Sequence, residues 1–130
     1  MTLYTRSIYD KPMPEDGTRI SVMSRHTKTD GITLDTRIQH VDEWLCQLSP
    51  SQKDVGGYYR HEIDLQELFS RYKLLLQKPY QQSEVQKLAK RALCEDITIL
   101  CVESDALKCH RSVLAEECRK YEPQLIIVHR

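Results

Sequence analysis

The alternation of apolar and polar residues in the first part of the chain predicts two short β-strands. Residues 3–9 form the first, and residues 18–23, in which Ile20 and Val22 alternate with polar neighbours, form the second. Between them, residues 10–17 are rich in Pro, Gly and acidic side chains, a composition typical of turns. The pattern leaves open whether the two strands pair as a hairpin or lie apart in the sheet.

The next pattern is helical but short. Apolar residues recur at i, i+3, i+4 and i+7 over residues 41–48, which predicts a helix with Trp44 and Cys46 in or near the hydrophobic core. Residues 24–31 are polar and predict a loop. Residues 51–60 contain two consecutive glycines and predict a second loop.

Two longer helices follow. The helical period is clearest over residues 65–76, with Asp64 as the N-cap. A second helix is predicted to begin at Ser83, because Gln86 three residues later completes a capping-box pattern. Five apolar residues form the expected buried stripe of this second helix: Val85, Leu88, Ala89, Ala92 and Leu93.

The C-terminal third predicts a strand-helix-strand unit. Residues 97–102 are almost all apolar or β-branched, which is typical of a central strand buried on both faces. Asp105 is the predicted N-cap of a helix over residues 106–121, and residues 124–128 are a predicted last buried strand. We therefore expect a single-domain α/β fold over residues 1–130, with three layers and a mainly parallel sheet flanked by helices on both sides.

Composition narrows the class of protein. The chain has 130 residues, 19 basic and 19 acidic, so its net charge gives no general attraction to nucleic acid or to an anionic membrane. It contains no apolar run long enough to span a membrane and no apolar signal segment at its start, so we expect a cytoplasmic protein. The five cysteines fit neither a disulfide framework nor paired zinc knuckles, and each is expected as a reduced thiol.

The turn between residues 97–102 and 106–121 is the predicted site. In a parallel sheet, ligands bind at the carboxyl ends of strands, and a helix N-terminus there favours anions. Cys109 is the candidate nucleophile, since a helix start lowers a thiol pKa, and Arg111 is the candidate anion ligand. For Cys101 and His110, a place in the core and a role in the site both stay open.

Two loops add further candidates. Arg25 and His26 follow the second predicted strand, and loops at strand ends commonly bind ligands. In the glycine-containing loop, the candidates are three consecutive residues: Tyr58, Tyr59 and Arg60. Glu103 follows the central strand and is a candidate partner for an arginine or a ligand.

Several segments, taken in order, carry a family resemblance: Asp16-Gly17 with Arg19-Ile20, residues 23–31, Leu48-Ser49-Pro50 with residues 55–60, Phe69-Ser70-Arg71-Tyr72, and residues 100–103 with Cys109-His110-Arg111. Together they resemble the YeaO-like proteins, domain-of-unknown-function family 488, over nearly the whole chain. Residues 24–31 stand where better-known members carry Arg-x-Trp-Pro-Arg-Gly, so no role of that tryptophan or second arginine is transferred. The resemblance implies a compact α/β fold in which the three candidate segments meet, and it implies no established activity.

We therefore expect a cytoplasmic protein that binds a small anionic or nucleotide-like molecule, with Cys109 and His110 as catalytic candidates if it is an enzyme, which stays open. The alternative is a thiol-redox or metal-responsive regulatory module without catalysis. We assign no metal ligands and no cofactor. A small anionic ligand is the expected partner, nucleic acid and membrane are not expected, and a homodimer stays open.

Overall fold

β4 (Ile97–Cys101) is the central strand of a five-stranded sheet, and all its residues are buried. The computed structural model describes residues 1–28 and 30–130, so Thr29 of the predicted loop lies outside the described residues. β4 is flanked by β1 (Thr2–Ser7) on one side and by β2 (Thr18–Ser21) on the other, and both pairings are parallel. The two N-terminal strands therefore lie apart, and the prediction of a buried central strand is confirmed.

The two edges of the sheet differ from the sequence prediction. β3 (Glu43–Trp44) is a parallel edge strand where a helix was predicted, and a 3₁₀ turn, η2 (Cys46–Leu48), follows it. Trp44 is 45% exposed and Cys46 is exposed, so their predicted place in the core is wrong. An eight-residue apolar pattern fits a helix and a strand-turn equally well, and pairing with β2 decides between them.

The opposite edge is β5 (Ile126–His129), which pairs with β1 alone. A strand was predicted here, but its predicted burial is wrong, because Ile126 is 58% exposed. The complete strand order is β3-β2-β4-β1-β5, with every pairing parallel. The predicted α/β class with a parallel sheet is confirmed.

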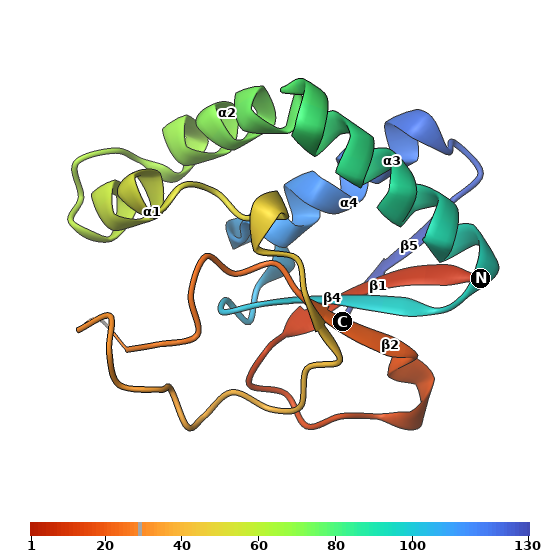
Figure 1. Ribbon diagram of the computed structural model, residues 1–130, viewed down its shortest axis with the longest axis horizontal. Helices are drawn as coiled ribbons and strands as arrows, with labels where there is room; N and C mark the ends of the chain where they lie inside the picture. Colours follow the sequence, from red (N-terminus) through yellow and green to blue (C-terminus); the bar gives the residue numbers. More distant parts are fainter. Residues whose placement is uncertain (29) are drawn as a thin grey trace.

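Four α-helices form one layer over the sheet: α1 (Gln52–Tyr59), α2 (Leu65–Leu76), α3 (Pro79–Cys94) and α4 (His110–Tyr121). Figure 1 shows them on a single face, although helices were expected on both. The connections on the other face, residues 8–17, 22–28 and 30–42, contain no α-helix. Among the described residues, no helix is both long and apolar enough to cross a membrane.

The starts of α1 and α3 depart from the sequence prediction. α1 replaces a predicted loop: the Ser51 side chain caps it by accepting from the backbone N–H of Asp54, and Gly57 is buried within it. α3 begins at Pro79 rather than Ser83, since a proline at the first helical position needs no N–H partner. The start of α2 is confirmed, with the Asp64 side chain accepting from the N–H of Glu67 at 2.8 Å.

α4 begins later than predicted, whereas α3 begins earlier. The Asp105 side chain caps a 3₁₀ turn, η3 (Ala106–Lys108), and α4 starts at His110 with Cys109 as its N-cap residue. The backbone N–H of Cys109 bonds to the carbonyl of Ala106, which closes the 3₁₀ turn before the α-helix begins. This shift changes the direction of each side chain from 106 to 111 relative to a continuous helix.

An ionic cluster fixes the connection between β1 and β2 on the face opposite the helices. Asp16 is fully buried and accepts from Arg19 at 2.6 Å and from Arg6 at 3.0 Å. Gly17 next to it has φ +64°, and a Cβ there would lie 2.1 Å from the carbonyl oxygen of Asp96. Only glycine therefore fits this turn between η1 (Pro14–Asp16) and β2.

Candidate functional site

A cavity of about 830 Å³ lies at the carboxyl ends of β1, β2 and β4. Its walls come from Tyr9, residues 23–28, residues 52–60 and residues 101–110, together with side chains of the 35–37 segment. In Figure 1, these segments meet where β4 ends and α4 begins, below α1. The structure therefore places a cavity at the strand ends where the sequence predicts a site.

Three buried side chains with N or S donors form the floor of this cavity. Cys101 ends β4, Cys109 caps α4 and His110 is the first residue of α4. The His110 Nδ1 atom lies 3.4 Å from the Cys101 sulfur and 3.9 Å from the Cys109 sulfur. All three ligand-type atoms lie within 4.8 Å of one another, so the strand end and the helix start bring together side chains eight and nine residues apart.

His110 is held on its other side by the backbone and by an aromatic ring. Its Nε2 lies 2.9 Å from the carbonyl oxygen of Val22, and because a carbonyl only accepts, Nε2 carries a proton. Nδ1 lies on the side of the Cys109 sulfur, whereas the Cys101 sulfur lies at similar distances from both ring nitrogens, 3.4 Å from Nδ1 and 3.5 Å from Nε2. Tyr72 packs edge-on against the imidazole with ring centroids 5.3 Å apart, which fixes the plane of the ring.

The two thiols of the floor have opposite pKa shifts. Burial and the neighbouring Cys109 raise the pKa of Cys101 well above that of an ordinary thiol. Burial also acts to raise the pKa of Cys109, but the Cys101 thiol, His110 and the backbone N–H of Arg111 stabilise its thiolate and lower its pKa well below the ordinary value. The surroundings therefore favour the thiolate form of Cys109 over that of Cys101.

Positive charge surrounds the mouth of the cavity. Five cationic side chains line it, namely Arg25, Lys28, Arg37, Arg60 and Lys108, whereas its carboxylates are Asp35 and Glu103. Arg37 pairs with Asp35, and Arg60 pairs with Glu62 outside the cavity. Within residues 1–28 and 30–130, no carboxylate lies within 4.0 Å of the charged atoms of Arg25, Lys28 or Lys108.

Two tyrosines of α1 form an aromatic wall. The rings of Tyr58 and Tyr59 are tilted by 58° with centroids 5.4 Å apart. The Tyr59 hydroxyl donates to Glu103 at 3.2 Å, which connects α1 to the segment after β4. Burial and the adjacent Glu103 carboxylate raise the pKa of Tyr59, so this hydroxyl stays protonated and acts as a donor.

Most of the sequence-predicted site residues line this cavity, and two do not. Arg25, Tyr58, Tyr59, Arg60 and Glu103 line it with the three floor residues. Arg111 lies behind the wall: it is fully buried, and its guanidinium donates to the carbonyls of Glu103 and Ser104. His26 accepts or donates at 2.7 Å with Ser21 and stacks on Trp44, which anchors the loop rather than facing the cavity.

Sequence reasoning missed a polar cluster of the wall that consists of Tyr9, Asp35 and Arg37. Tyr9 donates to Asp35 at 2.9 Å, and Arg37 holds the same carboxylate at 2.8 Å, which lowers the pKa of Asp35. Tyr9 lies two residues after the end of β1, so the same strand-end rule that selected Arg25 would have selected it. No local pattern identifies Asp35, because its partner Tyr9 is 26 residues away.

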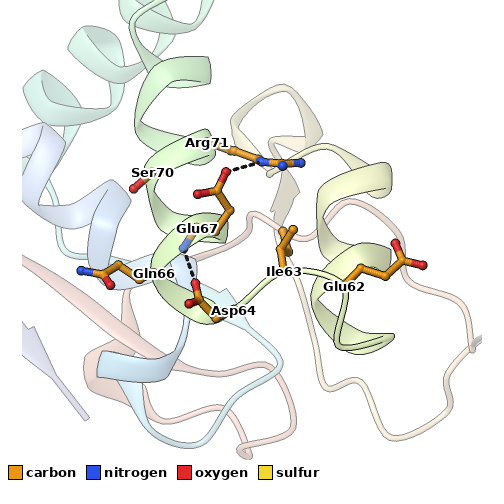
Figure 2. A pocket seen from close by; sticks show the side chains of 7 residues that line it. All are labelled: Glu62, Ile63, Asp64, Gln66, Glu67, Ser70 and Arg71. Atoms are coloured by element: carbon orange, nitrogen blue, oxygen red, sulfur yellow. Dashed lines mark hydrogen bonds and ion pairs between the residues drawn. The ribbon is translucent and has the colours of Figure 1, made fainter.

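A second hollow, of about 540 Å³, lies at the start of α2 (Figure 2). In Figure 2, its side chains are already paired: Glu67 binds Arg71, and Asp64 caps the Glu67 N–H. None of the floor residues of the first cavity lines it. We therefore take the cavity above Cys101, Cys109 and His110 as the candidate site.

Comparison with known families gives one match. The family model DUF488-N3a, described as the active DUF488-N3 subclade, matches residues 3–122. No curated protein and no solved structure matches the chain. The matched region runs from β1 through α4 and includes every residue that lines the cavity.

Proposed function

The chain belongs to the DUF488 family, and from that premise we propose that it binds a small anionic molecule in the cavity and that the Cys109 thiolate is the group that reacts with it. One observation carries the proposal: the buried Cys109 sulfur lies beside Cys101 and His110 on the floor of a cavity whose mouth is lined by cationic side chains. The description of the matching family as an active subclade agrees with a site that has kept reactive side chains.

The geometry supports a nucleophilic role for Cys109 rather than Cys101. Cys109 precedes the first turn of α4, where the free backbone N–H groups favour a negative charge. The Cys101 thiol and the His110 imidazole lie beside the Cys109 sulfur, and both act to lower its pKa. Cys118, by comparison, is a buried thiol whose pKa burial raises to about 12, and it is inert at neutral pH.

The rim supports the anionic character of the ligand. Arg25 is half-buried in the wall, and Lys28 and Lys108 are exposed at the mouth. A negatively charged molecule gains from all three, and the Tyr58 and Tyr59 rings offer a flat surface for an apolar or ring-shaped part. Arg111 acts as a positioning residue, because its two hydrogen bonds hold the 103–104 backbone that leads to the floor.

A thiol-redox module is the second candidate function. The sulfurs of Cys101 and Cys109 lie within 4.8 Å of one another, and a disulfide requires them to approach to about 2.05 Å. A low-pKa thiolate beside a second thiol is the arrangement of redox-sensing cysteines. A reducing cytoplasm, which is the location we propose, would keep both as thiols until an oxidant arrives.

The test compares an anionic and a neutral alkylating agent. In a chain carrying Cys46→Ser and Cys94→Ser, which removes the two exposed thiols, iodoacetate and iodoacetamide are reacted in parallel and Cys109 is followed by peptide mass spectrometry. A cationic cavity predicts a ratio of iodoacetate to iodoacetamide rates several-fold above that of free cysteine. Arg25→Gln should lower this ratio, whereas the matched change Arg119→Gln on the far end of α4 should leave it unchanged.

Two results would contradict the proposal. If the ratio of iodoacetate to iodoacetamide rates is the same for Cys109 and free cysteine, the proposal that the cavity binds anions is wrong. If Cys109 resists both agents to the same extent as the buried Cys118, the proposal that Cys109 is a reactive thiol is wrong. For the redox candidate, peroxide treatment should form a Cys101–Cys109 disulfide, and the absence of this crosslink would exclude it.

A further inference from the structure

The three floor residues also have the arrangement of a metal site. We propose that Cys101, Cys109 and His110 bind one thiophilic divalent cation, of which Zn²⁺ fits best, and that the fourth coordination position faces the cavity. This inference goes beyond the proposed function and stands on the donor geometry alone. It concerns a metal-loaded form in which the Cys109 sulfur is a ligand instead of a free nucleophile.

The two S···N distances fit the edges of a tetrahedral site. With Zn–S bonds of about 2.3 Å and a Zn–N bond of about 2.05 Å, a tetrahedral site has S···N edges of about 3.6 Å and an S···S edge of about 3.8 Å. The His110 Nδ1 atom lies 3.4 Å from one sulfur and 3.9 Å from the other, and the two sulfurs lie within 4.8 Å. A cation would therefore require shifts of only a few tenths of an ångström along the S···N edges.

The chemistry of the donors selects the class of cation. Two thiolates and one imidazole suit Zn²⁺ and other thiophilic ions, whereas Mg²⁺ and Ca²⁺ require oxygen ligands. His110 already has the outer contact found in such sites, because its Nε2–H donates to the Val22 carbonyl at 2.9 Å. That bond leaves Nδ1 free to coordinate, and Nδ1 lies 3.4 Å from the Cys101 sulfur and 3.9 Å from the Cys109 sulfur.

Rigid surroundings favour the same interpretation. The side chains of the three donors are buried, with Cys101 4%, Cys109 3% and His110 8% exposed. They come from the end of the central strand and from the start of α4, and Tyr72 fixes the plane of the imidazole. Donors held in this way lose little freedom when an ion binds.

The fourth position is left for a water molecule or a ligand. Among residues 1–28 and 30–130, no further His, Cys, Asp or Glu joins the three donors. All three line the cavity, so an ion bound to them would face its interior. Three protein ligands and one accessible position are the pattern of a reactive zinc site rather than a closed structural one.

The experiment uses the full chain with Cys46→Ser and Cys94→Ser as the reference protein, so that exposed thiols do not bind metal. The reduced, metal-free protein is titrated with Zn²⁺ against a chromophoric chelator. We expect one equivalent to bind. Adding Cys101→Ser, Cys109→Ser or His110→Gln should weaken binding by more than about 100-fold, beyond the 10–100-fold effect of losing an outer contact. Adding Cys118→Ser, which removes a buried thiol of α4 outside the cluster, should leave the affinity within a factor of two.

A spectroscopic measurement uses the reference protein, in which Cys101, Cys109 and His110 are unchanged, so its result does not depend on whether the variants fold. Co²⁺ bound to the reference protein should show sulfur-to-cobalt charge-transfer bands and the intense visible bands of a tetrahedral site. Reference protein without stoichiometric binding, or without these bands, would overturn the proposal, as would Cys101→Ser and Cys109→Ser variants of unchanged affinity.

The same titration separates this inference from the proposed function. In the metal-free protein, iodoacetamide should modify Cys109, and one equivalent of Zn²⁺ should protect it at least tenfold. Alkylation of the metal-free protein that is unchanged by Zn²⁺ contradicts the metal site and leaves the reactive thiol standing. Tight one-to-one Zn²⁺ binding by a protein whose Cys109 resists alkylation without metal contradicts the reactive thiol and leaves the metal site standing.

Discussion

Arg111→Met tests whether Arg111 supports the site from behind instead of contacting the ligand. The guanidinium is fully buried and donates to the carbonyls of Glu103 and Ser104. Hydrogen bonds from charged groups contribute about 1.5–3 kcal/mol each, so the two bonds together contribute about 3–6 kcal/mol. Methionine preserves the apolar stem and removes a buried charge whose Nε has no partner among the described residues, which offsets part of this loss. We expect a net destabilisation of about 2–4 kcal/mol.

Urea unfolding followed by circular dichroism measures this change directly. The matched variant is Arg25→Met, the same substitution at an arginine that lines the cavity and has no carboxylate within 4.0 Å among the residues described. For Arg25→Met we expect a change within about 0.5 kcal/mol, as for most partly exposed positions. The rate of Cys109 alkylation by iodoacetate should fall in both variants. In Arg25→Met this fall should occur without a change in stability.

The opposite order of stabilities would refute this account of Arg111. If Arg111→Met unfolds within about 0.5 kcal/mol of the natural chain, its two hydrogen bonds do not hold the 103–104 backbone. If Arg111→Met also abolishes the preference for iodoacetate while the protein keeps its stability, Arg111 contacts the anion itself, as the sequence alone suggested.

Three further predictions concern the scaffold around the site. Burial acts to raise the pKa of Asp16, but the Met13 N–H and two arginines lower this pKa below that of an ordinary aspartate. The ionised Asp16 therefore stabilises the fold fully above about pH 4, and this contribution is lost as the pH falls through the pKa of Asp16 in the folded protein. Asp16→Asn, which leaves Arg19 buried without its carboxylate, should cost about 3–5 kcal/mol at pH 7, and the difference from the natural chain should shrink in acid unfolding curves. Gly17→Ala should yield no stable folded protein by circular dichroism, because its Cβ would collide with a backbone carbonyl at 2.1 Å; a normal unfolding midpoint would contradict this. Tyr72→Phe removes a buried hydroxyl that donates to the Leu48 carbonyl and should cost about 1–2 kcal/mol in urea unfolding, and an unchanged free energy would show that water replaces the bond.

The parts of the fold predicted from sequence are those with a long or strict pattern. β4 is five apolar or β-branched residues in succession, and α2 keeps its helical period over 12 residues with an N-cap, so both are confirmed. Short patterns failed, since eight residues around Trp44 fit a helix or a strand. α1 was missed because its two glycines disfavour a helix, whereas the structure stabilises it with the Ser51 cap and the burial of Gly57.

The same distinction applies to the candidate site. The strand-end rule places Arg25 and Cys101 near one another, and both line the same cavity, because the rule depends on topology alone. The direction of Arg111 depends on where α4 begins, and a 3₁₀ turn that no sequence signal marks moves that start from residue 106 to His110. Side-chain directions at a helix start change with each residue of register, so this part required the structure.

The pH dependence of Cys109 alkylation tests the central claim most directly. In the chain with Cys46→Ser and Cys94→Ser, iodoacetamide modification of the peptide carrying Cys109 is timed by mass spectrometry at each pH. Because Cys101, His110 and the Arg111 N–H lower the pKa of Cys109, the rate should reach its plateau well below the ordinary thiol value of about 8.5, and Cys101→Ser should move the midpoint upward. A rate that rises with a midpoint at or above about 8.5, unaffected by Cys101→Ser, would show that the cavity floor holds an ordinary thiol.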